Sequence, residues 1–175
     1  ARDAAKILKI DRDQQTFLDL PFYEKGRYRN FFPANEDIDT LSNLLQTVKP
    51  HQVYVSGGLA DPGSVSGVCY RVFSSAMNRV RNEDWVKDCR VWSYRGVGQE
   101  WPLHEIDMAV PLSPGELASK IEASFQYRSQ RSQFPFRAAS HREIWQETDD
   151  INRSTAEAYD AVGMAEYEAI EAFKE

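Results

Sequence analysis

The residues best able to do chemistry lie in one loop, residues 57–67, with the sequence GGLADPGSVSG. The loop holds one carboxylate, Asp61, two hydroxyls, Ser64 and Ser66, and no histidine. A serine nucleophile needs a base, for which His104 is the candidate, but the loop lacks the G-x-S-x-G pattern of a nucleophile elbow. Its glycines could instead present backbone N–H groups to a phosphate, yet no Walker-type lysine or dinucleotide fingerprint accompanies them. The simpler interpretation is that these glycines turn the chain.

Residues that bind metals are sparse in the chain. The three histidines, His51, His104 and His141, lie far apart in the sequence, and no pair has ligand spacing. A catalytic zinc needs two or three histidine or carboxylate ligands held together, with an open position for water. The two cysteines, Cys69 and Cys89, have no second ligand nearby in the sequence, so we expect both to be small buried apolar groups. The residues therefore predict no metal site.

Composition restricts the class of protein and of partner. The chain has 175 residues, of which 42% are hydrophobic and 27% charged, which is typical of one globular domain with its own core. The 27 acidic residues outnumber 21 basic ones, which argues against a nucleic-acid partner. No segment reaches the roughly 18 apolar residues of a membrane span, so we expect a soluble protein, cytoplasmic or inside an organelle. The chain begins with Ala1 rather than methionine, which is compatible with a preceding segment.

Alternating patterns place the loop between a strand and a helix. Residues 51–56 read as a buried strand, and residues 62–81 carry an apolar stripe at helical spacing. The helix before this strand should begin near residue 35, with Asn35 as its cap, and end at Pro50. Residues 89–94 and 106–110 alternate with a period of two and predict further strands. This order of elements predicts an α/β fold with a parallel sheet.

The remaining segments predict further elements. Residues 16–20 read as a short strand closed by Pro21. Ser113 and Glu116 form a capping box that opens a helix to about residue 130. A further helix should run from about residue 140 to 161, with Gly163 as its left-handed C-cap, and residues 164–173 read as a short terminal helix.

Several short blocks of the sequence resemble one enzyme family. They include KPHQVY (49–54), LADP (59–62), DCRVW (88–92), QEW (99–101), HEI (104–106) and MAVP (108–111). Together with NR (152–153) and AEY (165–167), they resemble the PIG-L/LmbE-type deacetylase domain. The similarity is to the version of that domain fused behind a glucosamine-6-phosphate deaminase domain, and it covers roughly residues 16–173.

The resemblance implies a Rossmann-like three-layer α/β sandwich with a mainly parallel sheet. In that family a His-Pro-Asp-Asp loop and a histidine in an Asp-Pro-His-Gly-Thr-His loop hold zinc. The first motif has no counterpart here, and the second aligns with residues 61–66, where Gly63 and Ser66 replace the two histidines. Neither replacement is a good zinc ligand, so we expect no zinc and no other cofactor. The remnant of the pocket would be Asp61, Ser66, Arg95 and His104.

Two functions follow from the resemblance. In the first, residues 1–175 are the C-terminal part of one deacetylase-like domain that lacks its N-terminal strands and its catalysis. Such a domain would have a structural or interaction role, with another chain or an upstream domain covering the sheet. In the alternative, the chain is the C-terminal part of an amino-sugar enzyme, a deacetylase or a deaminase fusion, whose catalytic residues lie upstream.

Overall fold

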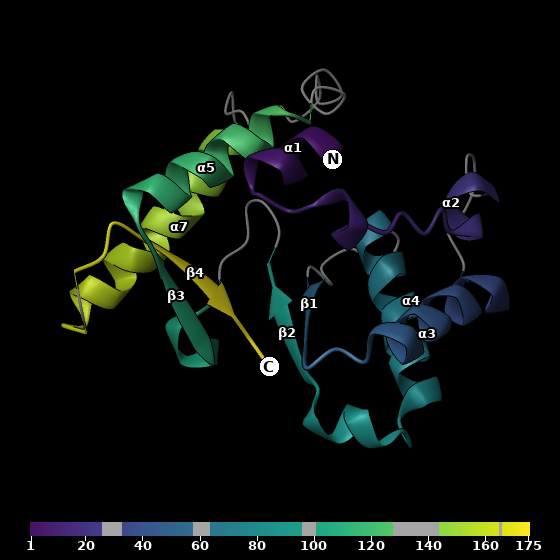
Figure 1. The fold of residues 1–175 in the computed structure, drawn as a ribbon. Helices are drawn as coiled ribbons and strands as arrows, with labels where there is room; N and C mark the ends of the chain where they lie inside the picture. Colours follow the sequence, from purple (N-terminus) through teal and green to yellow (C-terminus); the bar gives the residue numbers. More distant parts are fainter. Residues whose placement is uncertain (26–32, 58–63, 96–100, 128–143, 165) are drawn as a thin grey trace. The chain divides into compact units, whose positions relative to one another are not determined.

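The structure, a computed structural model, describes residues 1–25, 33–57, 64–95, 101–127, 144–164 and 166–175 (Figure 1). The chain divides into two compact units. The parallel unit comprises Phe17–Gly96 with Lys174–Glu175, and the antiparallel unit comprises Ala1–Thr16 with Val97–Phe173.

The parallel unit joins a pair of strands to helices. Its elements in chain order are α2 (Pro21–Lys25), α3 (Asn35–Val48), β1 (Gln52–Ser56), α4 (Val65–Val80), the 3₁₀ helix η2 (Asp84–Asp88) and β2 (Arg90–Tyr94). Strands β1 and β2 run parallel, with Tyr54 opposite Trp92 (Figure 1). Ser93 extends this pairing, because its N–H and C=O bond Lys174 at 2.7 and 3.0 Å. The α/β fold and the parallel pairing predicted from the sequence are confirmed.

The core of the parallel unit forms where α4 packs beside α3 and α2. Val68 and Val72 of α4 are fully buried against Phe22, with Leu20 and Leu41 at the margin. These valines fall on the stripe predicted from helical spacing. The same stripe predicts that Val65 in the first turn of α4 is buried, but this side chain is 40% exposed. Cys69, which we expected to be buried, is also exposed, because it lies at the edge of the packed face.

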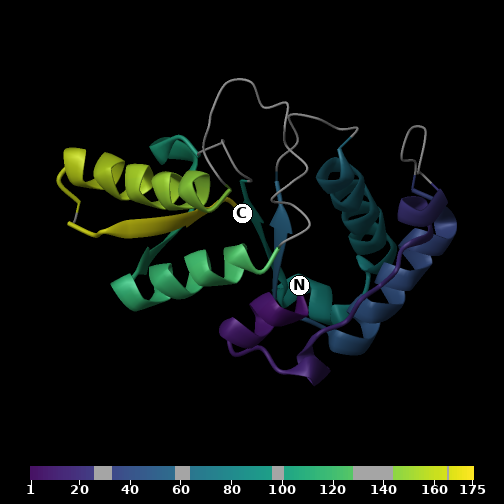
Figure 2. The same ribbon diagram turned by 90° about the horizontal axis from the view of Figure 1, so that it is seen from above.

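The antiparallel unit packs two longer helices with a pair of strands. Its elements are α1 (Arg2–Ile7), the 3₁₀ helices η1 (Arg12–Gln14) and η3 (Leu103–Glu105), β3 (Met108–Leu112), α5 (Pro114–Phe125), α7 (Ile144–Ala161) and β4 (Ala169–Phe173). Strands β3 and β4 are antiparallel, with Met108 opposite Phe173 and Leu112 opposite Ala169. Helix α7 lies along β4 (Figure 2).

Three local predictions were wrong. Residues 169–173 form β4 instead of a helix, because pairing with β3 and burial of Ala169 and Ile170 outweigh helix propensity. Residues 16–20 form no strand: Asp19 has φ 44°, a left-handed conformation that ends an extended run. Asn35 is the first residue of α3 rather than its cap, which is Ala34.

The predicted capping box of α5 is confirmed, although the helix ends at Phe125 rather than near residue 130. The Glu116 carboxylate accepts hydrogen bonds from the Ser113 hydroxyl at 2.7 Å and the Ser113 N–H at 2.8 Å. In return, the Glu116 N–H donates to the Ser113 hydroxyl at 3.3 Å. At the far end of α7, Gly163 has φ +74°, as its predicted role as a left-handed cap requires.

We expect this box to make the start of α5 sensitive to acid. Hydrogen bonds from the Ser113 hydroxyl and then its N–H hold the pKa of Glu116 below the ordinary glutamate value. Because the pKa of Glu116 is lower in the folded chain than in the unfolded one, the capping box stabilises the fold fully above the unfolded-state pKa. This stabilisation is lost as the pH falls through the folded-state pKa. An NMR titration of the Glu116 side chain should report this low pKa, and Ser113→Ala, which removes the hydroxyl but keeps the backbone N–H, should raise it towards the ordinary value. An ordinary pKa in the unaltered chain would contradict the capping box.

Candidate functional site

The candidate site lies at the carboxyl ends of β1 and β2. Because the strands are parallel, the chain leaves both of them at the same edge of the sheet. Open α/β sheets bind ligands at this edge. Gly57 follows β1 and donates its N–H to the Tyr94 carbonyl at 2.7 Å. A Cβ on Gly57 would lie 2.9 Å from the Cβ of Ser93, so only glycine fits this approach. The role of Gly57 is therefore to let the two strand ends come together.

Helix α4, the next element after β1, begins with a capped first turn. The Ser64 hydroxyl accepts the Gly67 N–H at 3.1 Å, which makes Ser64 the N-cap. The Ser64 hydroxyl therefore serves as hydrogen-bond acceptor for an N–H group of the first helical turn, which is a structural role and not that of a nucleophile. Ser66 lies in the first turn and is exposed.

The four residues predicted for the remnant pocket are distributed over both compact units and the part of the chain that the structure does not describe. Ser66 and Arg95 belong to the parallel unit, where Arg95 is half-buried directly after β2. His104 belongs to η3 of the antiparallel unit; its side chain is 81% exposed and its Nε2 lies 3.9 Å from Glu105 Oε1. Asp61, like Gly58 and Gly63 of the predicted phosphate cradle, lies outside the described residues.

Metal-ligating and nucleophilic groups are few in the part of the chain that the structure describes. Within it, no three His, Cys, Asp or Glu residues come close enough to hold a metal ion together. Desolvation raises the pKa of the Cys69 and Cys89 thiols, so both are protonated and weakly nucleophilic at neutral pH. Nor does any described helix combine the length and the apolar character needed to cross a bilayer.

Asp37 is a residue whose role the sequence did not reveal. Its carboxylate is fully buried and accepts the Phe22 N–H at 3.0 Å and the Ala34 N–H at 2.7 Å. The bond from the Ala34 N–H closes the N-terminus of α3. The bond from the Phe22 N–H joins α2 to the same turn of that helix. The signal in the sequence was an acid at the third helical position, a pattern that by itself indicates only a favourable interaction with the helix dipole.

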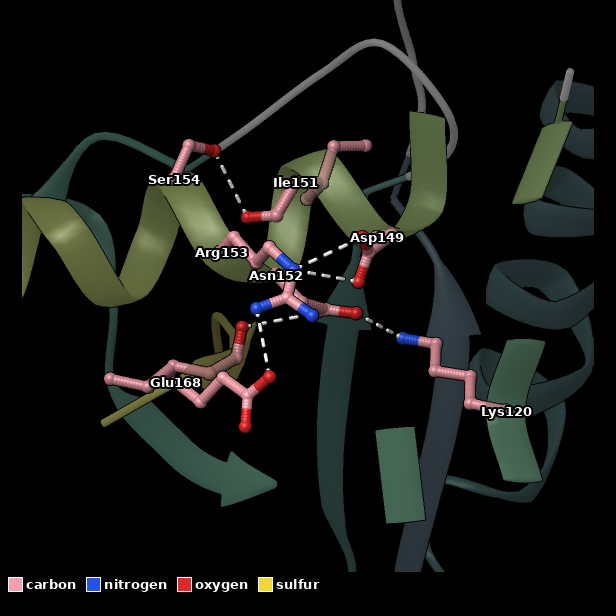
Figure 3. Close-up of polar contacts among 8 residues, drawn as sticks. Lys120, Asp149, Ile151, Asn152, Arg153, Ser154 and Glu168 are labelled. Carbon is pink, nitrogen blue, oxygen red and sulfur yellow. Dashed lines mark hydrogen bonds and ion pairs between the residues drawn. The ribbon is translucent and has the colours of Figure 1, made fainter. Parts of the chain in front are cut away.

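A polar cluster joins α5, α7 and β4 in the antiparallel unit (Figure 3). Asn152 is 3% exposed; its amide donates to the Ile170 carbonyl at 2.9 Å and accepts from Lys120 Nζ at 2.8 Å. Lys120 also pairs with Glu171 at 3.1 Å. On the next residue, Arg153 binds both oxygens of Asp149 at 3.0 Å and Glu168 at 2.9 Å. Hydrogen bonds to Asp149 and then Glu168 raise the pKa of Arg153.

We expect Asn152→Ala to lower the free energy of unfolding by about 1–2 kcal/mol, because the buried Ile170 carbonyl loses its donor. Urea denaturation measures the loss. The matched control is Asn78→Ala, because Asn78 is exposed on α4 and should cost about 0.5 kcal/mol or less. Equal losses in both variants would contradict a structural role for the Asn152 amide.

Comparisons with known proteins come from sequence and from structure. No family model matches the chain. A Bacteroides thetaiotaomicron protein described as glucosamine-6-phosphate deaminase-like is 43% identical over 177 residues, which cover 100% of this chain. The chain spans only 27% of that relative's length.

Two solved structures share the fold at low sequence identity. A conserved protein of Thermus thermophilus matches with a TM-score of 0.57 and 14% identity, over 99% of this chain and 70% of its own. GalB, the 4-carboxy-2-hydroxymuconate hydratase of Pseudomonas putida, matches with a TM-score of 0.60 and 15% identity, over 98% of this chain and 67% of its own. The chain thus has a Rossmann-like α/β fold with a partial sheet, and a glucosamine-6-phosphate deaminase-like protein is its relative in sequence.

Proposed function

We propose that residues 1–175 form a non-catalytic, PIG-L/LmbE-like part of a larger amino-sugar protein, with a structural or interaction role. In this proposal the residues constitute the C-terminal part of a single deacetylase-like domain. The observation that supports it is the sequence between β1 and α4, which contains no histidine at the positions where the resembled family has two.

The chemistry of the available groups supports this proposal. At the two positions where the resembled family has histidines, Gly63 has no ligand atom and Ser66 has a neutral hydroxyl. The neighbouring hydroxyl of Ser64 caps α4. No metal-binding group of three ligands occurs among the described residues to replace those that are lost. A deacetylase that relied on zinc-bound water would lack its nucleophile here.

The alternative is that the chain is a part of an active amino-sugar enzyme whose catalytic residues lie elsewhere. The name of the Bacteroides relative, and the 27% of its length that this chain spans, favour this function. In both cases the chain by itself would be inactive. The two differ in whether the complete protein releases acetate or ammonia from an amino sugar.

We further propose that another part of the same polypeptide, or another chain, covers the β1–β2 pair. Tyr54 and Tyr94 lie on the same face of this pair and remain 49% and 38% exposed, although strand residues of an open α/β sheet are usually covered on both faces. Exposed aromatic side chains grouped in this way are typical of a protein interface. Hydrogen exchange in residues 52–56 and 90–94 should slow in the complete protein relative to the isolated chain.

The function is tested by assaying the purified chain and the complete natural protein side by side. Acetate release from N-acetylglucosamine 6-phosphate and ammonia release from glucosamine 6-phosphate are measured for each. The first function predicts neither acetate nor ammonia from either sample. Release of either product by the isolated chain would overturn it, and release of either product by the complete protein alone would favour the alternative.

Restoring the missing imidazoles gives a matched experiment. The double variant Gly63→His with Ser66→His should gain zinc affinity in the complete protein only if the other family ligands are present there. In the isolated chain we expect no gain. The control variant, Gly63→Gln with Ser66→Gln, changes side-chain size without adding a strong zinc ligand.

A further inference from the structure

Large apolar side chains remain exposed where the chain turns from α7 into β4 (Figure 1). Val162 is 58% exposed, Met164 68% and Tyr167 50%. Every described residue from 160 to 168 is exposed, so nothing in the antiparallel unit covers this turn. We call Val162, Met164 and Tyr167 the apolar knob. Groups of exposed apolar side chains are typical of surfaces that a partner covers.

The backbone on both sides of the apolar knob is held by local contacts. The N–H groups of Gly163 and Met164 donate to carbonyls in the last turn of α7 at 2.8 and 3.1 Å, the paired bonds of a Schellman motif. Beyond the turn, Arg153 of α7 binds Glu168 at 2.9 Å. The apolar residue after the glycine of such a motif commonly packs back on its helix, but Met164 stays exposed. The knob is therefore presented on an ordered backbone, which lowers the entropic cost of docking a partner.

The charges beside the apolar knob indicate what a partner must carry. Glu157, Asp160 and Glu166 are exposed, and none of them forms an ion pair with another described residue. Asp160 lies in the last turn of α7, which contains no basic residue. A carboxylate there is unfavourable, because the helix dipole is negative at its C-terminus and favours a cation. A partner that covers the knob should therefore place cations beside its own apolar side chains.

A segment of the same polypeptide is the occupant to which these features point. The chain spans 27% of the length of its Bacteroides relative, so a protein of that length would hold most of its residues outside this chain. A tethered segment meets a surface at an effective concentration in the millimolar range when its linker is short. From the exposed apolar side chains and the acids beside them, we propose that the apolar knob docks a lysine-containing, apolar segment of the same polypeptide outside residues 1–175. This inference rests on the proposed function, in which the chain is part of a larger protein.

The test compares the reactivity of Met164 in the isolated chain and in the complete natural protein. Dilute hydrogen peroxide oxidises an exposed methionine thioether to the sulfoxide, and peptide mass spectrometry gives the rate at each methionine. Met77, in the other compact unit, is the internal reference. We expect Met164 to be oxidised several-fold more slowly, relative to Met77, in the complete protein. Equal relative rates in the two samples would overturn the proposal.

Carboxylate-to-lysine cross-linking with a carbodiimide identifies the occupant. In the complete protein, Glu157, Asp160 or Glu166 should form amide links to lysines outside residues 1–175. Links only to lysines within residues 1–175 of a second copy would overturn the proposal. Protection of Met164 that appears in the isolated chain as its concentration rises would overturn it as well, because the occupant would then be a second copy.

Charge reversal tests the role of the acids. In the complete protein, Glu157→Lys with Glu166→Lys should raise the oxidation rate of Met164 to that of the isolated chain. The matched control, Glu83→Lys with Glu122→Lys, changes two other exposed acids by the same charge and should leave Met164 protected. Equal effects of the two double variants would contradict the arrangement.

The outcomes for this inference and for the proposed function are distinguishable. Acetate or ammonia released by the isolated chain would overturn the proposed function, whatever the reactivity of Met164. An inactive complete protein in which Met164 is oxidised as fast as in the isolated chain would overturn the docking proposal alone.

Discussion

Asp37→Ala is expected to lower the free energy of unfolding by about 3 kcal/mol, a large share of the stability of a domain of this size. The Asp37 carboxylate is fully buried and is the acceptor for the backbone N–H groups of Phe22 and Ala34. Alanine would leave two donors without an acceptor and a small cavity beside the Phe22–Val68–Val72 core. Urea denaturation followed by circular dichroism gives the difference.

Two further substitutions identify the cause of this loss. Asp39→Ala removes the same side chain from an exposed position of α3, where it pairs with Arg79, and should cost less than about 1 kcal/mol. Asp37→Asn keeps the shape but leaves only one acceptor oxygen, so its cost should be intermediate. If Asp37→Ala were as mild as Asp39→Ala, the carboxylate could not be what joins α2 to α3.

Gly57→Ala is expected to cost about 2–3 kcal/mol, because the new methyl group meets a side chain that cannot move away. The added Cβ would lie 2.9 Å from Ser93 Cβ, and the Gly57 N–H that bonds Tyr94 at 2.7 Å would shift with it. Thermal or urea unfolding measures the cost.

A double-mutant cycle tests whether Ser93 is the cause. Adding Ser93→Gly to Gly57→Ala removes the opposing Cβ and should recover most of the loss. The control is Gly115→Ala in the first turn of α5, where an added Cβ meets nothing within 4 Å, so stability should stay equal or rise slightly. Additive costs in the cycle would show that the strand ends do not meet in the way described.

Local signals in the sequence predicted the elements that depend on local chemistry. The capping box of Ser113 and Glu116 and the left-handed Gly163 were correct because each is satisfied within a few residues. The apolar stripe of α4 identified the core, since Val68 and Val72 follow helical spacing.

The wrong predictions concern residues whose conformation depends on distant partners. Residues 169–173 contain alanine and glutamate, which favour a helix, but β3 supplies a strand to pair with them. Asn35 satisfies the composition of a cap, yet the cap is Ala34, whose N–H donates to the Asp37 carboxylate. The same carboxylate is buried and also accepts the N–H of the distant Phe22. Contacts of this kind cannot be inferred from the spacing within one segment.

The sequence predicted which elements flank the candidate loop. The sequence located the loop after β1 and the helix that follows it, and the structure has β1 and α4 on either side of that loop. The grouping of Ser66 and Arg95 with His104 stays a prediction, because His104 belongs to the other compact unit.

The most direct test of the central claim is the zinc content of the purified protein. The chain as it is made in the cell is isolated without chelator, passed through gel filtration, and analysed by inductively coupled plasma mass spectrometry. The loss of both loop imidazoles predicts far less than one zinc per chain, with a melting temperature that EDTA does not change. One zinc per chain, whose removal by EDTA lowers the melting temperature, would contradict the proposed loss of the metal site.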